Sequence, residues 1–194
     1  MSTIKLIVGL ANPGPQYSDT RHNAGAWFVE QLARDHQADF KPDQKFHGFT
    51  TKIHPGGSPV HLLIPTTFMN RSGQAVQAMS HFYKINPDEI LVAHDELDFS
   101  AGVARLKLEG GHGGHNGLRD IIQKLGGARD FPRLRIGIGH PGDKSKVHSY
   151  VLKNPNSQDK QSIEDAIRDA ANQIDSIAVG DLAKAMNQLH TDKE

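Results

Sequence analysis

The first 25 residues place the strongest constraint on how this chain can fold. An apolar run at residues 4–10 ends in the loop sequence ANPGP, and the polar cluster TRHN at residues 20–23 precedes the next apolar segment. This order predicts a buried strand, a long loop and the start of a helix. Ligands of α/β proteins bind where strands give way to helices, because backbone amides and short polar side chains are free there. His22, in the polar cluster, is therefore our candidate catalytic residue.

Strand and helix patterns alternate along the rest of the chain. Residues 48–53 and 60–65 resemble strands on either side of a Pro-Gly-Gly turn, which predicts an antiparallel hairpin. Further strands are predicted at 90–93, 104–108 and 133–139. Helices are predicted at 23–36, from a Ser72 cap to near residue 86, at 118–125, at 157–179 and from residue 181.

These elements predict one α/β domain that spans residues 1–194, because no internal repeat or second core is visible. We expect a three-layer arrangement in which a mixed, mostly parallel twisted sheet has helices on both faces. The chain has no cysteine, which excludes disulfides, thiolate metal sites and a cysteine nucleophile. The opening residues MSTIKLIVGL resemble neither a signal peptide nor a membrane span, so we expect a cytoplasmic protein without a membrane partner.

The formal net charge is zero, which argues against a protein that grips nucleic acid with its whole surface. The charge is unevenly distributed, however. Residues 101–150 contain nine basic and four acidic residues, a local net charge of +5. Such a segment could hold a few phosphates. From charge counting alone, an ordinary solvated surface is the favoured interpretation.

Covalent catalysis has no obvious candidate, because the chain lacks cysteine and the G-x-S-x-G motif. An activated water is then the simplest nucleophile, and histidine is the side chain that accepts a proton near neutral pH. Asp95, at the end of a predicted strand, is the carboxylate we expect behind the second nitrogen of His22. Considered singly, one of twelve histidines is more often a surface or capping residue than a base.

Asn12, Asn70 and Asn116 lie in three loops at comparable strand ends. A carboxamide offers donors and an acceptor without charge, so it can hold a carbonyl group, a water or a ribose hydroxyl. The alternative is that these asparagines only form turns. Several amides that converge on one histidine favour a site.

A metal site is the competing interpretation. His112, His115 and Asp95 could act as ligands, since imidazole and carboxylate both bind zinc. The His-x-x-His spacing lies in a glycine-rich loop and lacks the rigid helical frame of H-E-x-x-H. A metal-dependent hydrolase is therefore the less favoured alternative.

Five motifs occur in order along the chain: LIVGLANPGPQYSDTRHNAG, PTTFMNRSG, HDELD, GGHGGHNGLRD and RLRIGIGHPG. Together they closely resemble the bacterial peptidyl-tRNA hydrolase family, over the whole chain. The resemblance implies a single-domain α/β monomer that cleaves the ester joining a peptide to the terminal ribose of tRNA. It also implies that no metal or cofactor is used. A non-catalytic tRNA-binding module is the other alternative.

The resemblance assigns roles to particular residues. It places the catalytic histidine on His22 and the aspartate that orients it on Asp95. Catalytic or positioning amides fall on Asn12, Asn70 and Asn116. Substrate-binding positions fall on Tyr17, Met69, Asn70, Asn116 and His115, and tRNA-binding positions on Lys107, Arg135 and Lys144, with Arg105 in the same basic segment. Three positions depart from the family pattern: Ala11, Arg71 and His94.

Overall fold

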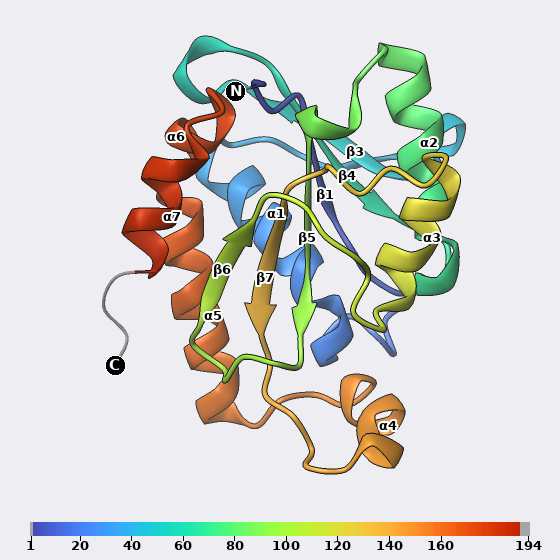
Figure 1. Cartoon of the computed structure of the whole chain (residues 1–194), viewed down its shortest axis with the longest axis vertical. Coiled ribbons are helices and arrows are strands. Elements are labelled where there is room, and N and C mark those ends of the chain that lie inside the picture. Colours follow the sequence, from blue (N-terminus) through green and yellow to red (C-terminus); the bar gives the residue numbers. More distant parts are fainter. Residues whose placement is uncertain (1, 191–194) are drawn as a thin grey trace.

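The computed structural model describes residues 2–190, and in this part of the chain the strands form one seven-stranded sheet (Figure 1). Its strand order is β2-β3-β4-β1-β5-β7-β6. The strands are β1 (Leu6–Gly9), β2 (Lys41–Asp43), β3 (Gly48–Ile53), β4 (Val60–Pro65), β5 (Ile90–Glu96), β6 (Ala104–Lys107) and β7 (Arg133–Gly137).

The sheet is mixed and carries helices on both faces, which confirms the expected fold class. Parallel pairing is confined to the four central strands, β4-β1-β5-β7. Both edges are antiparallel: β2-β3-β4 on one side, including the predicted hairpin, and β6-β7 on the other. In the described residues parallel pairs therefore do not outnumber antiparallel ones, so the expected parallel majority describes the centre of the sheet alone.

Helices pack against the two faces in separate groups. One face is covered by α1 (Ala24–Asp35), α5 (Ser157–Ala171), α6 (Ile174–Ala178) and α7 (Leu182–His190). The other is covered by α2 (Ser72–Tyr83) and α3 (Asn116–Lys124), while α4 (Val147–Val151) lies beyond the ends of β5 and β7 (Figure 1). None of these described helices is long and apolar enough to cross a membrane.

Alternation along the strands explains the two layers of the core. Leu6 and Val8 of β1 face the α2 and α3 side, whereas Ile7 between them faces α1. Buried strands present opposite faces at successive residues, so each apolar run supplies both cores.

Three local expectations were wrong. The predicted helix at 157–179 is interrupted between α5 and α6, at residues 172–173. Ser72 does not cap α2: it is the first helical residue, and its hydroxyl donates to the carbonyl oxygen of Met69 at 2.7 Å. No strand was predicted between residues 36 and 48, yet Lys41–Asp43 form the short edge strand β2.

The start of α1 packs directly against the backbone of the sheet. Gly25 lies so close to β5 that an added Cβ would collide with the carbonyl oxygen of Ala93. It would also lie 2.8 Å from the amide nitrogen of Leu10. A glycine at this position therefore permits the close approach of α1 to the two central strands.

Candidate active site

Three side chains from distant parts of the sequence meet at the carboxyl end of β5. Asp95 lies within β5, His22 lies in the short 3-10 helix η1 (Arg21–Asn23) before α1, and His115 is the N-cap residue of α3. Because β1 and β5 are adjacent and parallel, the loop that follows β1 lies beside the carboxyl end of β5. The carboxyl ends of these strands point towards α4 in Figure 1.

The Asp95 carboxylate lies between the two imidazole rings. Nδ1 of His22 is 3.0 Å from Oδ1 and 2.9 Å from Oδ2 of Asp95, and Nε2 of His115 is 2.8 Å from Oδ1. The Asp95 side chain is only 3% exposed, so these hydrogen bonds replace the water it has lost. The structure thus brings together His22 and Asp95, as predicted, and adds His115 to them.

In each histidine one ring nitrogen faces Asp95, and the other nitrogen differs in its partners. Nδ1 of His115 accepts hydrogen bonds from the backbone amides of Gly117, at 3.1 Å, and Leu118, at 3.4 Å. His115 must then carry its proton on Nε2 and donate it to Asp95. His22 donates to Asp95 from Nδ1, and its Nε2 has no hydrogen-bond partner within residues 2–190. The free Nε2 of His22 can therefore accept a proton from a ligand.

Electrostatics support this assignment. Burial raises the pKa of Asp95, but the charges and hydrogen bonds of His22 and His115 outweigh it and hold that pKa well below its usual range. Burial lowers the pKa of His22, whereas the charge and hydrogen bond of Asp95 raise it, and the net result is a pKa above the ordinary value. The pair is arranged as a carboxylate that stabilises a protonated imidazole.

His94 belongs to the same region but remains neutral. Its Nδ1 donates to the backbone carbonyl of Asp95 at 2.8 Å, and its ring packs edge-on against His115, with 5.1 Å between centroids. Burial, followed by the charge of His115, lowers the pKa of His94 to about 3. The departure at this position therefore adds no positive charge near neutral pH.

Asn12 is fixed by the backbone around it. Its Oδ1 accepts from the amide of Met69 at 2.7 Å, which joins the two predicted loops. The side chain of Asn23 accepts from the Asn12 amide at 2.9 Å and donates to its carbonyl at 3.0 Å. Because its oxygen is engaged, Asn12 has its Nδ2 hydrogens left to donate to a ligand.

The other predicted polar residues lie at the margins of the cluster. Asn116, exposed in the first turn of α3, accepts from Arg119 at 3.2 Å through Oδ1, which again leaves Nδ2 as a donor. Asn70 is exposed in η4 (Met69–Arg71) and lines a neighbouring cavity. Tyr17 packs edge-on against Phe68, 6.3 Å between ring centroids. None of these side chains hydrogen-bonds to Asp95 or to the two histidines in the described structure.

Comparison with known proteins agrees with this arrangement. A family model described as peptidyl-tRNA hydrolase matches residues 6–194. This chain belongs to the peptidyl-tRNA hydrolase family. It is 59% identical to a peptidyl-tRNA hydrolase of Pectobacterium carotovorum over 193 residues, which cover 100% of this chain and 99% of the relative. One from Yersinia enterocolitica is 58% identical, covering 100% and 98%.

The fold agrees as well. The crystal structure of peptidyl-tRNA hydrolase from Acinetobacter baumannii superposes with a TM-score of 0.96 at 51% identity. The match covers 100% of this chain and 97% of that structure. The motifs identified in the sequence thus lie in a fold shared with the peptidyl-tRNA hydrolase family.

The metal alternative loses one of its predicted ligands. His112 is not part of the cluster, because its Nδ1 accepts from the amide of Gly114 at 2.9 Å, within its own loop. Among residues 2–190, the group that could hold an ion is instead His22, Asp95 and His115, whose ligand atoms lie within 4.8 Å of one another. These atoms face one another at hydrogen-bonding distances, and the chemistry of a hydrogen-bonded triad accounts for each of them.

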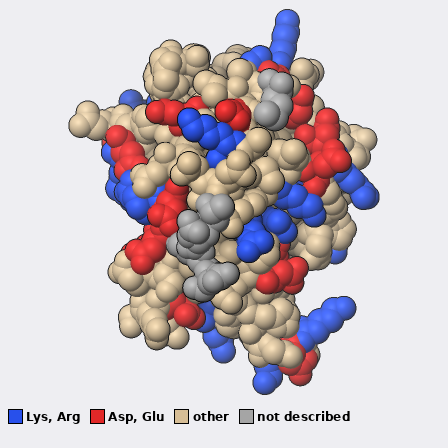
Figure 2. All heavy atoms as spheres, turned by 60° about the vertical axis from the view of Figure 1, so that its left-hand side comes forward, with Lys and Arg blue, Asp and Glu red and all other residues tan. Residues whose placement is uncertain are grey.

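The predicted basic residues fall into two places. Arg105 of β6 is paired opposite Arg135 of β7, and both guanidinium groups lie over the Phe99 ring, at 5.3 and 4.7 Å from its centroid. Lys107 lies two residues further along the same face of β6, whereas Lys144 belongs to the separate 3-10 helix η6 (Lys144–Lys146). On the side seen in Figure 2, Lys and Arg are interspersed with Asp and Glu. The predicted basic residues therefore form a small group on β6 and β7 and a separate position on η6, and they do not form a continuous basic surface on this side.

Arg133, one of the nine basic residues of the segment 101–150, is buried and does not contribute to a basic surface. It is 1% exposed, and its guanidinium donates to the carbonyl oxygens of Gly110 and Gly111, both at 2.6 Å, and of Arg129 at 3.1 Å. It holds the loop that leads into α3 and is not available to phosphates. The loop that covers it comes from another part of the sequence, so no local pattern indicates its burial.

Two supporting residues were missed by sequence reasoning. The side chain of Asn23, the last residue of the polar cluster at 20–23, bonds the Asn12 backbone in both directions. Arg21 stacks on Tyr150 of α4, with its guanidinium carbon 3.8 Å from the ring centroid, and donates to the Tyr150 carbonyl at 3.0 Å. This contact joins the turn that carries His22 to α4, and no local pattern in the sequence indicates it.

Proposed function

We propose that this chain hydrolyses the ester between a peptide, or an N-blocked amino acid, and the 3'-terminal ribose of tRNA. The observation that carries the proposal is the free Nε2 of His22, whose Nδ1 is held by a buried carboxylate. This is the arrangement of a general base that can activate water without a metal. Membership of the peptidyl-tRNA hydrolase family supports the choice of substrate.

The reaction needs one proton acceptor that later becomes a donor. His22 Nε2 takes a proton from water as the water oxygen attacks the ester carbonyl carbon. The tetrahedral intermediate then breaks its bond to the ribose oxygen, which takes the proton back from His22. The products are a peptide with a free carboxyl group and a tRNA with a free terminal hydroxyl. Asp95 stabilises the imidazolium between the two steps.

The asparagines donate hydrogen bonds to the ester carbonyl and position the ribose. Nδ2 of Asn12 and of Asn116 are donors for the peptide carbonyl, the attacking water or the negative charge that develops in the intermediate. A donor aimed at a developing oxyanion contributes roughly 2.7 to 4 kcal/mol to transition-state stabilisation. Asn70 positions the ribose end, and Tyr17, Met69 and His115 are the further residues assigned to substrate binding.

The nucleic-acid part of the substrate binds through the basic residues. Arg105, Lys107, Arg135 and Lys144 contact phosphates of the tRNA, and the protein acts as a cytoplasmic monomer. Each phosphate contact releases counterions, so loss of Lys107 or Arg135 should weaken binding and reduce its salt dependence by about one unit of log–log slope. Titrations of labelled tRNA at several salt concentrations measure this, and an unchanged slope removes the residue from the surface.

The test of the proposal is release of N-acetylated amino acid from labelled acyl-tRNA in excess chelator. We expect rapid release by the wild-type protein. Release that appears only when the chelator is omitted would favour metal chemistry at His22, Asp95 and His115. Binding of tRNA with no release under either condition would favour a non-catalytic tRNA-binding module.

A further inference from the structure

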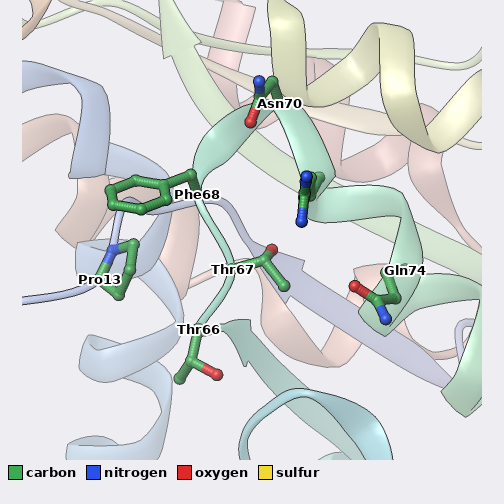
Figure 3. A pocket seen from close by; sticks show the side chains of 7 residues that line it. Pro13, Thr66, Thr67, Phe68, Asn70 and Gln74 are labelled. Carbon is green, nitrogen blue, oxygen red and sulfur yellow. The ribbon is translucent and has the colours of Figure 1, made fainter.

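A second concave feature adjoins the site. A cavity of about 540 Å³ lies beside Asn70, between the loop that follows β4 and the start of α2. Figure 3 shows Pro13 and Phe68 on one side of it, with Thr67 and Gln74 opposite. Phe68 is 57% exposed, so a large part of its ring offers an apolar surface to the cavity. The cavity therefore has one apolar wall and one polar wall.

The polar wall is made of neutral and cationic groups. Thr67, Asn70, Arg71 and Gln74 line it, and no acidic residue does so in the described structure. Arg71 is exposed and forms no ion pair within residues 2–190. The Thr67 hydroxyl is buried without a hydrogen-bond partner, a condition that a ligand atom would relieve. Gln74 Nε2 has one weak contact, 3.5 Å from Nε2 of His47.

Arg71 and Gln74 both belong to the start of the twelve-residue α2, as its N-cap residue and its third residue. The N-cap residue, Arg71, makes no side-chain cap hydrogen bond. The positive end of a helix favours a negative group within its first turn. The Asp120 carboxylate already occupies part of this turn, because it accepts from the Gly73 amide at 2.8 Å. The preference of the cavity for an anion therefore comes from its side chains, Arg71 above all.

We infer that this cavity is a subsite for an oxyanion group of the substrate, with Arg71 as its specificity-determining residue. The inference rests on the proposed function, since the group belongs to peptidyl-tRNA: it is a carboxylate side chain of the peptide or a phosphate near the acceptor end. Arg71 pairs with the oxygens, and the Thr67 hydroxyl completes their hydrogen bonds. Pro13 and Phe68 pack against the carbon atoms that carry the group.

Kinetics with two matched substrates test this. Both are N-acetyl-dipeptidyl-tRNAs with the same tRNA and the same esterified residue, and they differ only in an Asp or an Asn before it. A peptide carboxylate in the subsite predicts that wild type prefers Asp roughly fivefold in kcat/KM, the scale of a partly exposed ion pair. Arg71→Leu should bring the ratio close to one, and Arg71→Lys should retain part of it.

A phosphate in the subsite gives a different result. Arg71→Leu then lowers kcat/KM of both substrates by a similar factor and reduces the log–log salt slope by about 0.7, the value for one contact to a single strand. Arg34→Leu is the matched control, because Arg34 is exposed near the end of α1, away from the cavity, and should change neither quantity.

An Arg71→Leu variant with the wild-type ratio and the wild-type salt slope overturns the inference. The failure of the proposed function is distinct. In that case the wild-type protein releases no peptide from the Asn substrate. Hydrolysis of the Asn substrate does not depend on the subsite, so this result would count against the proposed function alone.

Discussion

The turn that carries His22 and the start of α3, which carries His115, present the same side chain to the same carboxylate. Each imidazole donates one hydrogen bond to Asp95, and their exposed fractions are similar, 13% and 9%. They differ in the second ring nitrogen. Two backbone amides donate to Nδ1 of His115, whereas Nε2 of His22 has no hydrogen-bond partner among residues 2–190. The comparison teaches that contact with Asp95 does not by itself distinguish the two histidines. The unoccupied nitrogen does, and it is the reason we propose His22 as the base.

The largest expected difference between the two histidines appears when each ring is removed in turn. We expect His22→Ala to lower kcat/KM by about 10⁴-fold, the upper range for a general base. His115→Ala should lower it about tenfold, because Asp95 loses one charge-assisted hydrogen bond but keeps its contact with His22. Single-turnover release assays, with tRNA binding measured in parallel, separate the two. Equal losses would mean that both rings, or neither, act as the base.

Removing the shared carboxylate should affect the two histidines differently. In Asp95→Asn the carboxamide can donate to Nδ1 of His22, which moves the ring proton to Nε2 and abolishes the acceptor. We expect kcat/KM to fall by about 10³ to 10⁴-fold with tRNA binding retained. Asp39→Asn is the matched control, since it removes one exposed carboxylate elsewhere on the chain. A loss below tenfold would separate Asp95 from the chemistry.

The pH profile tests which ring titrates. A protonated His22 cannot accept a proton, and Asp95 raises its pKa, so protonation extends to higher pH. We therefore expect kcat/KM to fall towards acid with a midpoint above about 6.5, the ordinary value for histidine. His115→Asn should keep this acid limb. A midpoint at or below 6.5 would contradict the proposed electrostatics of the pair.

The smallest expected effect concerns the structural role of His115. Its Nδ1 caps α3, so His115→Ala should reduce the free energy of unfolding by about 1 kcal/mol, and His115→Asn by less, because asparagine is a good cap. Denaturant titrations of the three proteins measure the difference. Equal destabilisation by alanine and asparagine would mean that the hydrogen bonds accepted by Nδ1 do not stabilise the start of α3. Those hydrogen bonds would then no longer support the tautomer assigned to His115.

Much of the fold could be predicted from local patterns. The hairpin of β3 and β4 was visible because apolar residues surround a Pro-Gly-Gly turn, and both strands have the predicted bounds. The approach of His22 to Asp95 followed from one rule, that the carboxyl ends of parallel strands share an edge. The expected parallel majority was wrong for the sheet as described, because β6 pairs antiparallel with β7 across a long connection that no local pattern specifies.

The supporting contacts of the site could not be predicted, because they join residues far apart in sequence. His115 was expected to bind substrate or metal, and its bond to Asp95 depends on how α3 packs against the sheet. Likewise, the burial of Arg133 depends on the loop that crosses it. The break at residues 172–173 contains no glycine or proline, so the helix pattern continued through it.

The missing side chain of Gly25 has a consequence for anyone who transfers this site to another scaffold. His22 and Asp95 reach 2.9 Å from one another across the gap between helix and sheet, and Gly25 packs in that gap against Ala93, two residues before Asp95. A methyl group there would push the helix outward, together with the turn that carries the imidazole. Copying His22 and Asp95 alone would therefore fail, because the absence of a side chain at Gly25 sets the distance between helix and sheet on which their alignment depends.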